Sequence, residues 1–191
     1  MKGRLFILIL LGALALGLNS CGGGGGGGGV GAISSDSGGT FSAATILVDS
    51  DVAVWTGTPC ATGSTYTVLP NDDNVTFTAF SAPAGSTGNT PEKVVIDNVT
   101  IAFTPATVGS PALPPQYQAI GQQVALGGSA TFPVRVASQK LKSDPPLNSL
   151  VCTSTIYGYR ATMLFNCHYL VSGNTFQGST QINISFADFG N

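Results

Sequence analysis

The stretch Phe-Gln-Gly-Ser-Thr-Gln-Ile-Asn-Ile-Ser-Phe, residues 176–186, decides the fold class. Every second residue from Phe176 to Phe186 is apolar, Gly or Thr, and the residues between them are all polar. Because successive side chains of a strand point to opposite faces, this period of two predicts a strand with one buried and one solvated face. The segment 156–171 alternates in the same way, and the turn-forming residues 172–174 join the two runs. The sequence therefore predicts an antiparallel hairpin over residues 156–186.

Similar alternation recurs along the chain from residue 41 onward. Further strands are predicted at 44–55, 65–69, 74–80, 95–103, 117–126 and 130–136. Pro133 has no N–H to donate, which places the last of these at a sheet edge or a bulge. One turn of helix is expected at 138–141, before Asp144 and two prolines end it. Roughly seven to nine strands in about 150 residues indicate an all-β, antiparallel two-sheet sandwich, with a jelly roll or an antiparallel barrel as the alternative.

The first twenty residues have the order of a secretory signal sequence. Lys2 and Arg4 precede an apolar run over 5–18, which is shorter than the ~20 residues of a membrane-spanning helix. The run ends in Leu-Asn-Ser-Cys at 18–21, which resembles the lipobox of bacterial lipoproteins. The resemblance implies that residues 1–20 are removed and that Cys21 carries palmitate-type acyl chains, which would anchor the chain to a membrane. A secreted protein without lipid and an uncleaved apolar segment are the alternatives.

Glycine dominates the segment that follows Cys21. Residues 22–29 are eight consecutive glycines, and Gly and Ser remain frequent up to residue 40. Such a segment cannot bury enough apolar surface to offset the entropy lost on ordering. We therefore expect a flexible tether over 21–40 and a β domain over 41–191. Gly22, in place of Asp after the cysteine, is similar to lipoproteins sent to an outer membrane, either at its periplasmic face or at the cell surface.

Three short stretches of the β region resemble immunoglobulin-like domains of bacterial envelope lipoproteins. They are Val-Thr-Ile-Ala-Phe at 99–103, a Gly-Gly-Ser turn at 127–129 before Phe-Pro-Val-Arg-Val at 132–136, and the closing residues 184–189. The resemblance implies an immunoglobulin-like sandwich. Trp55 precedes all three cysteines of the domain, so the Cys–Trp–Cys order of antibody domains is absent.

Disulfides form and persist outside the cytoplasm, so the cysteines of an exported chain can pair. Lipid accounts for Cys21, which leaves Cys60, Cys152 and Cys167. The run between Cys152 and Cys167 would span roughly 50 Å if extended, and a bridge needs Cα atoms within about 7 Å. Cys60 and Cys152 both lie at boundaries between loops and predicted strands, so we expect the disulfide between these two. Cys167 falls on the apolar face of its strand, where a buried thiol is expected.

The composition includes few of the residues that usually carry out catalysis or bind nucleic acids. The net charge is −2, and charged residues make up 8% of the chain, which excludes a basic nucleic-acid footprint. His168 is the only histidine, and its neighbour Cys167 points to the opposite face of the strand. Motifs for hydrolases, zinc and covalent haem are absent. We therefore expect no cofactor and a non-catalytic protein.

Two sets of side chains are candidates for ligand binding. Four aspartates are candidates for a calcium site: Asp49, Asp51, Asp72 and Asp73. Solvated carboxylates of a strand face and a turn are the alternative for them. Three aromatic residues are candidates for a platform that stacks on a sugar or peptide: Trp55, Tyr157 and Tyr159. Core packing is the alternative here.

The resulting functional expectation is an envelope lipoprotein with a non-catalytic binding or structural domain. A carbohydrate-binding or adhesin-like module, and a subunit of an envelope or extracellular assembly, are the alternatives. The expected partners are the membrane, through the lipid, and a protein or glycan outside it. Because fold does not imply function, the sequence leaves the identity of that partner open.

Overall fold

The computed structural model describes residues 38–81 and 92–189, and the described chain is almost entirely β. The strands are β1 (Gly39–Ala43), β2 (Leu47–Asp51), β3 (Val54–Thr56), β4 (Thr65–Thr67), β5 (Asn71–Ala79), β6 (Lys93–Pro105), β7 (Gln116–Ala125), β8 (Ser129–Ala137), β9 (Tyr157–Tyr169) and β10 (Thr175–Ala187). Between β8 and β9 lie the helix α1 (Gln139–Ser143) and the 3₁₀ turn η1 (Leu147–Leu150). The all-β prediction is confirmed. The predicted signal sequence, Cys21 and the glycine run lie outside the described residues.

The strands form two large sheets and one small ribbon. The five-stranded sheet has the order β2-β10-β9-β6-β7, the three-stranded sheet β1-β5-β8, and the ribbon consists of β3 and β4. The predicted hairpin of β9 and β10 is present, with Thr175 opposite His168 at its closed end. The expectation that all strands pair antiparallel is wrong at one place, because β2 runs parallel to β10. The five-stranded sheet is therefore mixed.

The parallel pair arises because the chain changes sheets between β1 and β2. Ala44 N–H still donates to Asn74 O of β5 at 2.7 Å, whereas Ile46 O already accepts Asn183 N–H of β10 at 2.8 Å. The direction of the chain is kept across this step, so a strand antiparallel to β5 continues as a strand parallel to β10. The single strand predicted at 44–55 instead contains this step at its start and is divided further on between β2 and β3. Alternation alone does not reveal to which sheet a residue belongs.

Phenylalanine rings fill the space between the inner faces of the two large sheets. Phe41 of β1 stacks on Phe165 of β9 with ring centroids 4.1 Å apart, and Phe132 of β8 meets Phe165 edge-on at 6.1 Å. Every second residue of β10 from Phe176 to Phe186 is buried, as the alternation predicted. Removing a buried Phe ring from such a core costs about 3–5 kcal/mol. This shared core fixes the two sheets against each other.

The ordered β structure begins earlier than the expected boundary at residue 41. Gly38 and Gly39 are both buried, and β1 starts at Gly39. A Cβ atom on Gly38 would overlap the ring of Phe176, and one on Gly39 would overlap the Thr78 carbonyl oxygen. Glycine at these two positions is therefore required by close packing, and the last part of the expected tether belongs to the domain.

The region around β8 follows the sequence-based expectation. Pro133 lies in β8, which is an outer strand of the three-stranded sheet. Proline is tolerated at such an edge, because no further strand of this sheet needs its missing N–H. Ser138 caps α1 by accepting the Leu141 N–H on its hydroxyl oxygen at 3.1 Å. Within residues 38–81 and 92–189, no helix is long and apolar enough to cross a membrane.

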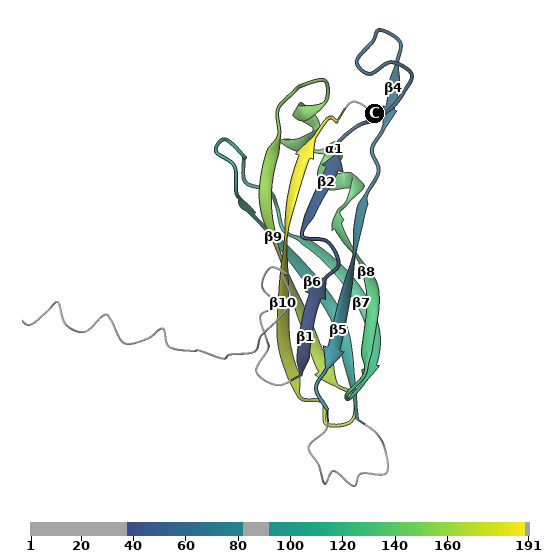
Figure 1. Ribbon diagram of the computed structural model, residues 1–191, viewed down its shortest axis with the longest axis vertical. Coiled ribbons are helices and arrows are strands. Elements are labelled where there is room, and N and C mark those ends of the chain that lie inside the picture. The colour runs from purple at the N-terminus through teal and green to yellow at the C-terminus, as the bar shows by residue number, and fades with distance from the viewer. Residues whose placement is uncertain (1–37, 82–91, 190–191) are drawn as a thin grey trace, which may run out of the picture.

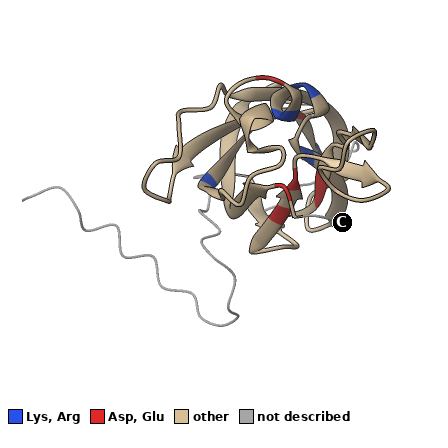
Figure 2. Ribbon diagram, turned by 90° about the horizontal axis from the view of Figure 1, so that it is seen from above, with Lys and Arg blue, Asp and Glu red and all other residues tan. Residues whose placement is uncertain are grey.

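The domain is elongated, and its two ends differ. Figure 1 shows the β3–β4 ribbon near the end at which the C-terminus lies, whereas β1 begins toward the opposite end. Residues 54–67, which form the ribbon and its connecting loop, contain no charged side chain, and Figure 2, which looks at the domain from above, shows that Lys, Arg, Asp and Glu are few over the domain. Long-range charge steering toward the ribbon is therefore weak.

Candidate functional site

A disulfide fixes the β3–β4 ribbon to the segment that follows η1. Cys60 and Cys152 are bonded with Cα atoms 5.6 Å apart, so the predicted pairing is confirmed. Both residues have positive φ, 58° and 61°, which is uncommon for residues other than glycine and marks a turn at each. The bond closes a loop of 92 residues. A crosslink of that span stabilises a fold by up to about 4.7 kcal/mol in the chain-entropy description.

The carboxylate of Asp188 gathers the groups around this disulfide. It accepts the indole N–H of Trp55 on Oδ1 at 3.1 Å and the backbone N–H of Cys152 on Oδ2 at 2.7 Å. Sulfur atoms of Cys60 and Cys152 and an oxygen of Asp188 lie within 4.8 Å of one another. Because both sulfurs are joined in the disulfide, they offer no thiolate to a metal ion. The cluster is a structural junction, and sequence reasoning missed Asp188 because its partners are remote in the chain.

The predicted aromatic platform is only partly realised. Trp55 is half-buried and packs against Tyr66 of β4, with ring centroids 5.0 Å apart, and Tyr66 is 44% exposed. Tyr159, by contrast, is a core residue, and its hydroxyl donates to Pro111 O at 2.9 Å. Burial raises the pKa of Tyr159 to about 12. Tyr157 is half-buried and packs against the same core. The prediction of Tyr159 as a ligand contact is therefore wrong. The aromatic ring that lies beside Trp55 belongs to Tyr66.

The four aspartates considered for calcium do not come together. Asp49 is exposed on β2, and Asp51 accepts the N–H groups of Ala53 and Phe189 at 3.1 and 3.3 Å. Asp72 pairs with Arg135 at 3.0 Å. Asp73 is buried and accepts the Thr45 hydroxyl and the Asn74 N–H at 2.8 and 2.9 Å. Among residues 38–81 and 92–189, the disulfide cluster is the sole group of three possible metal ligands. The calcium candidates are therefore dispersed, each with its own role.

His168 and Cys167 occupy opposite faces of β9, as expected. His168 Nδ1 lies 2.9 Å from Asp97 Oδ2 on the outer face of the sheet, where both side chains are about one-third exposed. Cys167 is buried, and burial, with a smaller contribution from Asp97, raises the pKa of its thiol to about 12. A thiol in that state is a poor nucleophile. The His168–Asp97 pair was missed in the sequence because Asp97 sits at a bulge in β6.

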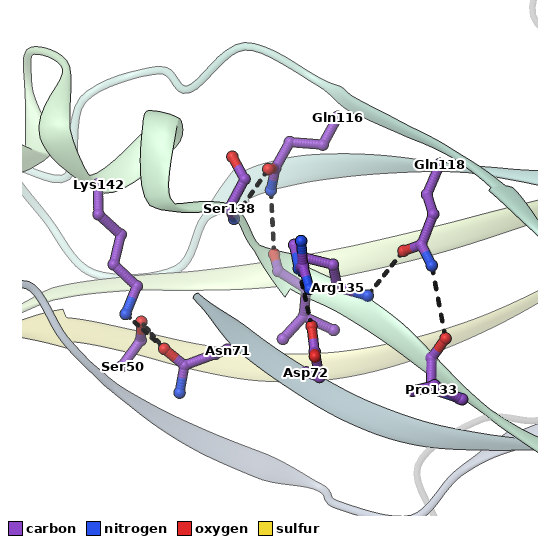
Figure 3. Close-up of polar contacts among 10 residues, drawn as sticks. Ser50, Asn71, Asp72, Gln116, Gln118, Pro133, Arg135, Ser138 and Lys142 are labelled. Atoms are coloured by element: carbon purple, nitrogen blue, oxygen red, sulfur yellow. Dashed lines mark hydrogen bonds and ion pairs between the residues drawn. The ribbon is translucent and has the colours of Figure 1, made fainter. Parts of the chain in front are cut away.

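Two glutamine side chains connect the large sheets along the β7–β8 edge. Gln118 accepts the Arg135 N–H on Oε1 at 2.7 Å and donates to Pro133 O at 3.5 Å. Gln116 likewise accepts the Ser138 N–H at 3.0 Å and donates to Val136 O at 3.1 Å. Figure 3 shows both amides reaching from β7 to the backbone of β8. Each carboxamide thus takes the place of a neighbouring strand and protects an otherwise open edge.

Two hollows lie along this edge. One, of about 270 Å³, is lined by Ile101, Gln116, Tyr117, Gln118, Arg135 and Ser138. The other, of about 310 Å³, shares Gln116 and Ser138 and is bordered by prolines at 114, 115 and 145. Both volumes are at the low end for small-molecule pockets. The amide groups on their walls are already bonded to β8, so the hollows offer few unused polar groups.

A buried lysine is the least expected feature of the domain. Lys142 of α1 is 2% exposed, and its Nζ donates to Asp51 O at 2.7 Å and to Asn71 Oδ1. Ser50, which is fully buried, donates its hydroxyl to the same Asn71 oxygen at 2.9 Å. Desolvation lowers the pKa of Lys142 to about 8, although the charge of Asp51 opposes this shift. This cluster could not be predicted from the sequence, because the residues of α1 are mostly polar and such residues are usually exposed to solvent.

Comparison of the chain with protein-family models, with curated proteins and with solved structures gave no match in any of the three.

Proposed function

We propose that this chain is a lipid-anchored protein of a bacterial envelope, whose β domain acts without catalysis as a binding or structural module. The observation that carries the proposal is the Cys60–Cys152 disulfide, because such bonds persist in exported proteins and are rare in the cytosol. It agrees with the signal-like residues 1–20 and the lipobox-like Cys21, which were identified on independent grounds. Outer-membrane attachment, suggested by Gly22, is part of the proposal.

We further propose that the domain is an immunoglobulin-like sandwich. The strand order supports this assignment: β5 pairs with β8 in one sheet, and β10-β9-β6-β7 are neighbours in the other. In an immunoglobulin domain these positions correspond to strands B and E, and to G, F, C and C′. β1 and β2 together take the place of the first strand, with β1 in one sheet and β2 in the other. Cys167 lies in β9, the F position, whereas β5 contains no cysteine, so a Phe cluster stands where antibody domains have their disulfide.

The end of the domain that carries the β3–β4 ribbon is the part we assign to binding a protein or glycan. The chain enters the domain at Gly38, toward the opposite end, so a tether from a membrane would leave the ribbon outermost (Figure 1). The ribbon offers Trp55 and Tyr66 as adjoining, partly exposed rings held in place by the disulfide. Rigid aromatic side chains of this kind are frequent in binding surfaces because ordering them costs little entropy. A carbohydrate-binding module is the second candidate, since the same rings can stack on a sugar.

Lipid labelling tests the anchor directly. Cells that express the full chain are grown with a labelled fatty acid, and membrane and soluble fractions are compared for the unaltered protein and Cys21→Ser. We expect label and membrane retention to be lost together in Cys21→Ser. The matched control is Cys60→Ser/Cys152→Ser, which removes the disulfide and keeps the label. Unchanged membrane retention of Cys21→Ser would refute the anchor.

Photo-crosslinking from the ribbon tests the binding end. A photoreactive residue at position 66 is compared with one at position 117, because Tyr117 is also exposed but lies on β7. We expect crosslinks to a partner from position 66 that Trp55→Ala weakens, and few from position 117. Binding of the purified full chain to a glycan array separates the two candidate partners. Equal crosslinking from both positions, undiminished in Trp55→Ala, would contradict the assignment of the ribbon.

A further inference from the structure

The environment of Lys142 is unusual for a charged side chain. The residue is 2% exposed, and both groups that its Nζ contacts are neutral, a backbone carbonyl of Asp51 and the carboxamide of Asn71. Lys142 differs in this from Arg135 and Lys140, whose side chains pair directly with Asp72 and Asp144. Burying an ammonium against neutral acceptors is costly, and the charge of Asp51 offsets this cost only in part, so a larger fraction of Lys142 is the uncharged, nucleophilic amine than for an exposed lysine.

The amine lies against a group that it can attack. Nζ of Lys142 is 2.5 Å from Oδ1 of Asn71, closer than the usual range of about 2.7–3.2 Å. Because a carbonyl bond is about 1.2 Å long, Cγ of Asn71 lies no more than about 3.7 Å from Nζ. Reacting atoms in productive complexes are about 3–3.5 Å apart. A small side-chain adjustment therefore brings the amine to the carbonyl carbon.

The neighbouring residues suit the charge that such an attack creates. The Ser50 hydroxyl already donates to Asn71 Oδ1 at 2.9 Å, where negative charge develops when a nucleophile adds to the carbonyl. Figure 3 shows the Lys142 side chain extending from α1 and meeting Ser50 and Asn71 at one point. All three groups are held on separate elements of the fold, α1, β2 and β5, so folding itself brings them together.

We propose that Lys142 and Asn71 are joined by an amide bond between their side chains. Uncharged Nζ adds to Cγ of Asn71, the bond between Cγ and Nδ2 breaks, and Nδ2 leaves as ammonia with the proton that Nζ releases. No oxidant, reductant or other reactant is consumed. We assign the relay of this proton to Asp51, the carboxylate whose charge acts on Lys142. Ser50 is then a positioning residue that holds the carbonyl oxygen.

Such a bond would complement the disulfide. It would join residues 71 positions apart and tie α1 to the start of β5. Unlike the disulfide, an amide bond is not broken by reductants. For a domain held outside the cytoplasm, a second covalent link of this kind limits the conformational freedom of the unfolded chain, and hence its exposure to proteases. The modification is a property of the folded chain and is independent of what the ribbon binds.

Mass spectrometry of the full chain, purified from membranes, then reduced and alkylated, tests the proposal. We expect the protein to be lighter by one ammonia than the mass calculated for the processed and lipidated chain, and a proteolytic digest to contain one branched peptide with Lys142 and Asn71. Lys142→Arg and Asn71→Ala should each restore the full mass. Lys140→Arg, which changes an exposed lysine in the same helix, should retain the loss. The unaltered protein decides the matter even if a variant fails to fold.

Separate linear peptides containing Lys142 and Asn71, with the full intact mass, would overturn the proposal. A loss of ammonia that persists in Lys142→Arg would overturn it as well, because it would then come from a cyclised asparagine. Asp51→Asn keeps the oxygen that accepts the Ala53 and Phe189 N–H groups and should lower the linked fraction several-fold. An unchanged linked fraction in Asp51→Asn would refute the relay assigned to Asp51.

Discussion

The indole Nε1 of Trp55 lies 3.1 Å from Oδ1 of Asp188, although the two residues are 133 positions apart in the sequence. The same carboxylate accepts the Cys152 N–H at 2.7 Å, immediately beside the disulfide. One side chain after the last strand thus holds the ribbon, the disulfide and the end of β10 in a fixed arrangement. The orientation of the Trp55 ring, and with it the proposed binding end, depends on this carboxylate.

Replacing Asp188 is therefore expected to destabilise the domain. Asp188→Ala removes a charged acceptor from two donors, and hydrogen bonds to charged groups contribute about 1.5–3 kcal/mol. We expect the free energy of unfolding, measured in urea with the disulfide intact, to fall by about 2 kcal/mol. Asp49→Ala is the matched control, because Asp49 is exposed on β2, and its effect should stay within about 0.5 kcal/mol. Equal shifts of the two urea midpoints would contradict the role given to Asp188.

Reduction of the Cys60–Cys152 bond is expected to cost more. Loss of a disulfide in a small exported domain lowers the free energy of unfolding by about 2–5 kcal/mol. The measurement is urea unfolding of the full chain with and without a reductant. Cys60→Ser/Cys152→Ser is the control, because a reductant should have no further effect on it. If Cys60, Cys152 and Cys167 all react with an alkylating agent in unfolded, unreduced protein, the bond is absent.

Local pattern was sufficient for most strands but not for their assignment to sheets. The alternation at 176–186 predicted β10 and its buried face, and the turn at 172–174 predicted the β9–β10 hairpin. The segment 44–55 was predicted to be one strand. It contains instead the sheet change at Ala44–Ile46 and the break between β2 and β3, and the sheet change depends on which strands lie alongside and not on the local residues.

The candidate sites divide in the same way. The Cys60–Cys152 pair could be predicted because few cysteines were available, strand length disfavoured a bond between Cys152 and Cys167, and Cys60 and Cys152 both lie where loops meet strands. Asp188, Gln118 and Lys142 could not be predicted, because each acts on a partner that is remote in the sequence. For Lys142, the local composition even pointed to the opposite environment. Tyr159 was misassigned because alternation gives the face of a strand but not whether that face meets solvent.

The glutamine contacts along the β7–β8 edge lead to a prediction for hydrogen exchange. Gln118→Ala removes the acceptor of the Arg135 N–H, and Gln116→Ala removes that of the Ser138 N–H. A net hydrogen bond is worth about 1 kcal/mol, so each amide should exchange roughly five-fold faster in its own variant. Exchange is measured by NMR on the labelled full chain.

Each glutamine variant serves as the control for the other. Gln118→Ala should leave the Ser138 amide unchanged, and Gln116→Ala should leave the Arg135 amide unchanged, because one carboxamide bonds within β8 and the other at its end. Faster exchange of both amides in both variants would mean that the whole edge opens together. That result would contradict the view that each carboxamide protects its own site.

The state of Lys142 predicts how stability depends on pH. An unlinked Lys142 has a folded-state pKa lowered from 10.5 to about 8 by burial, so the unfolded chain binds more protons between these values. The free energy of unfolding then rises with pH in this window, by up to about 3 kcal/mol, and its cost is fully present below pH 8. We expect this rise in Asn71→Ala, where the amine cannot be acylated, when its stability is compared with that of Asn71→Ala/Lys142→Met.

The unaltered protein should lack this rise. An acylated Nζ does not titrate, so the stability difference between the unaltered chain and Lys142→Met should be flat from pH 8 to 10.5. Urea unfolding at several pH values on the full chain measures both differences, and the subtraction removes the titration of other groups that the paired variants share. A rise in the unaltered protein as large as that in Asn71→Ala would show a free amine at position 142, and would count against the crosslink independently of the mass measurement.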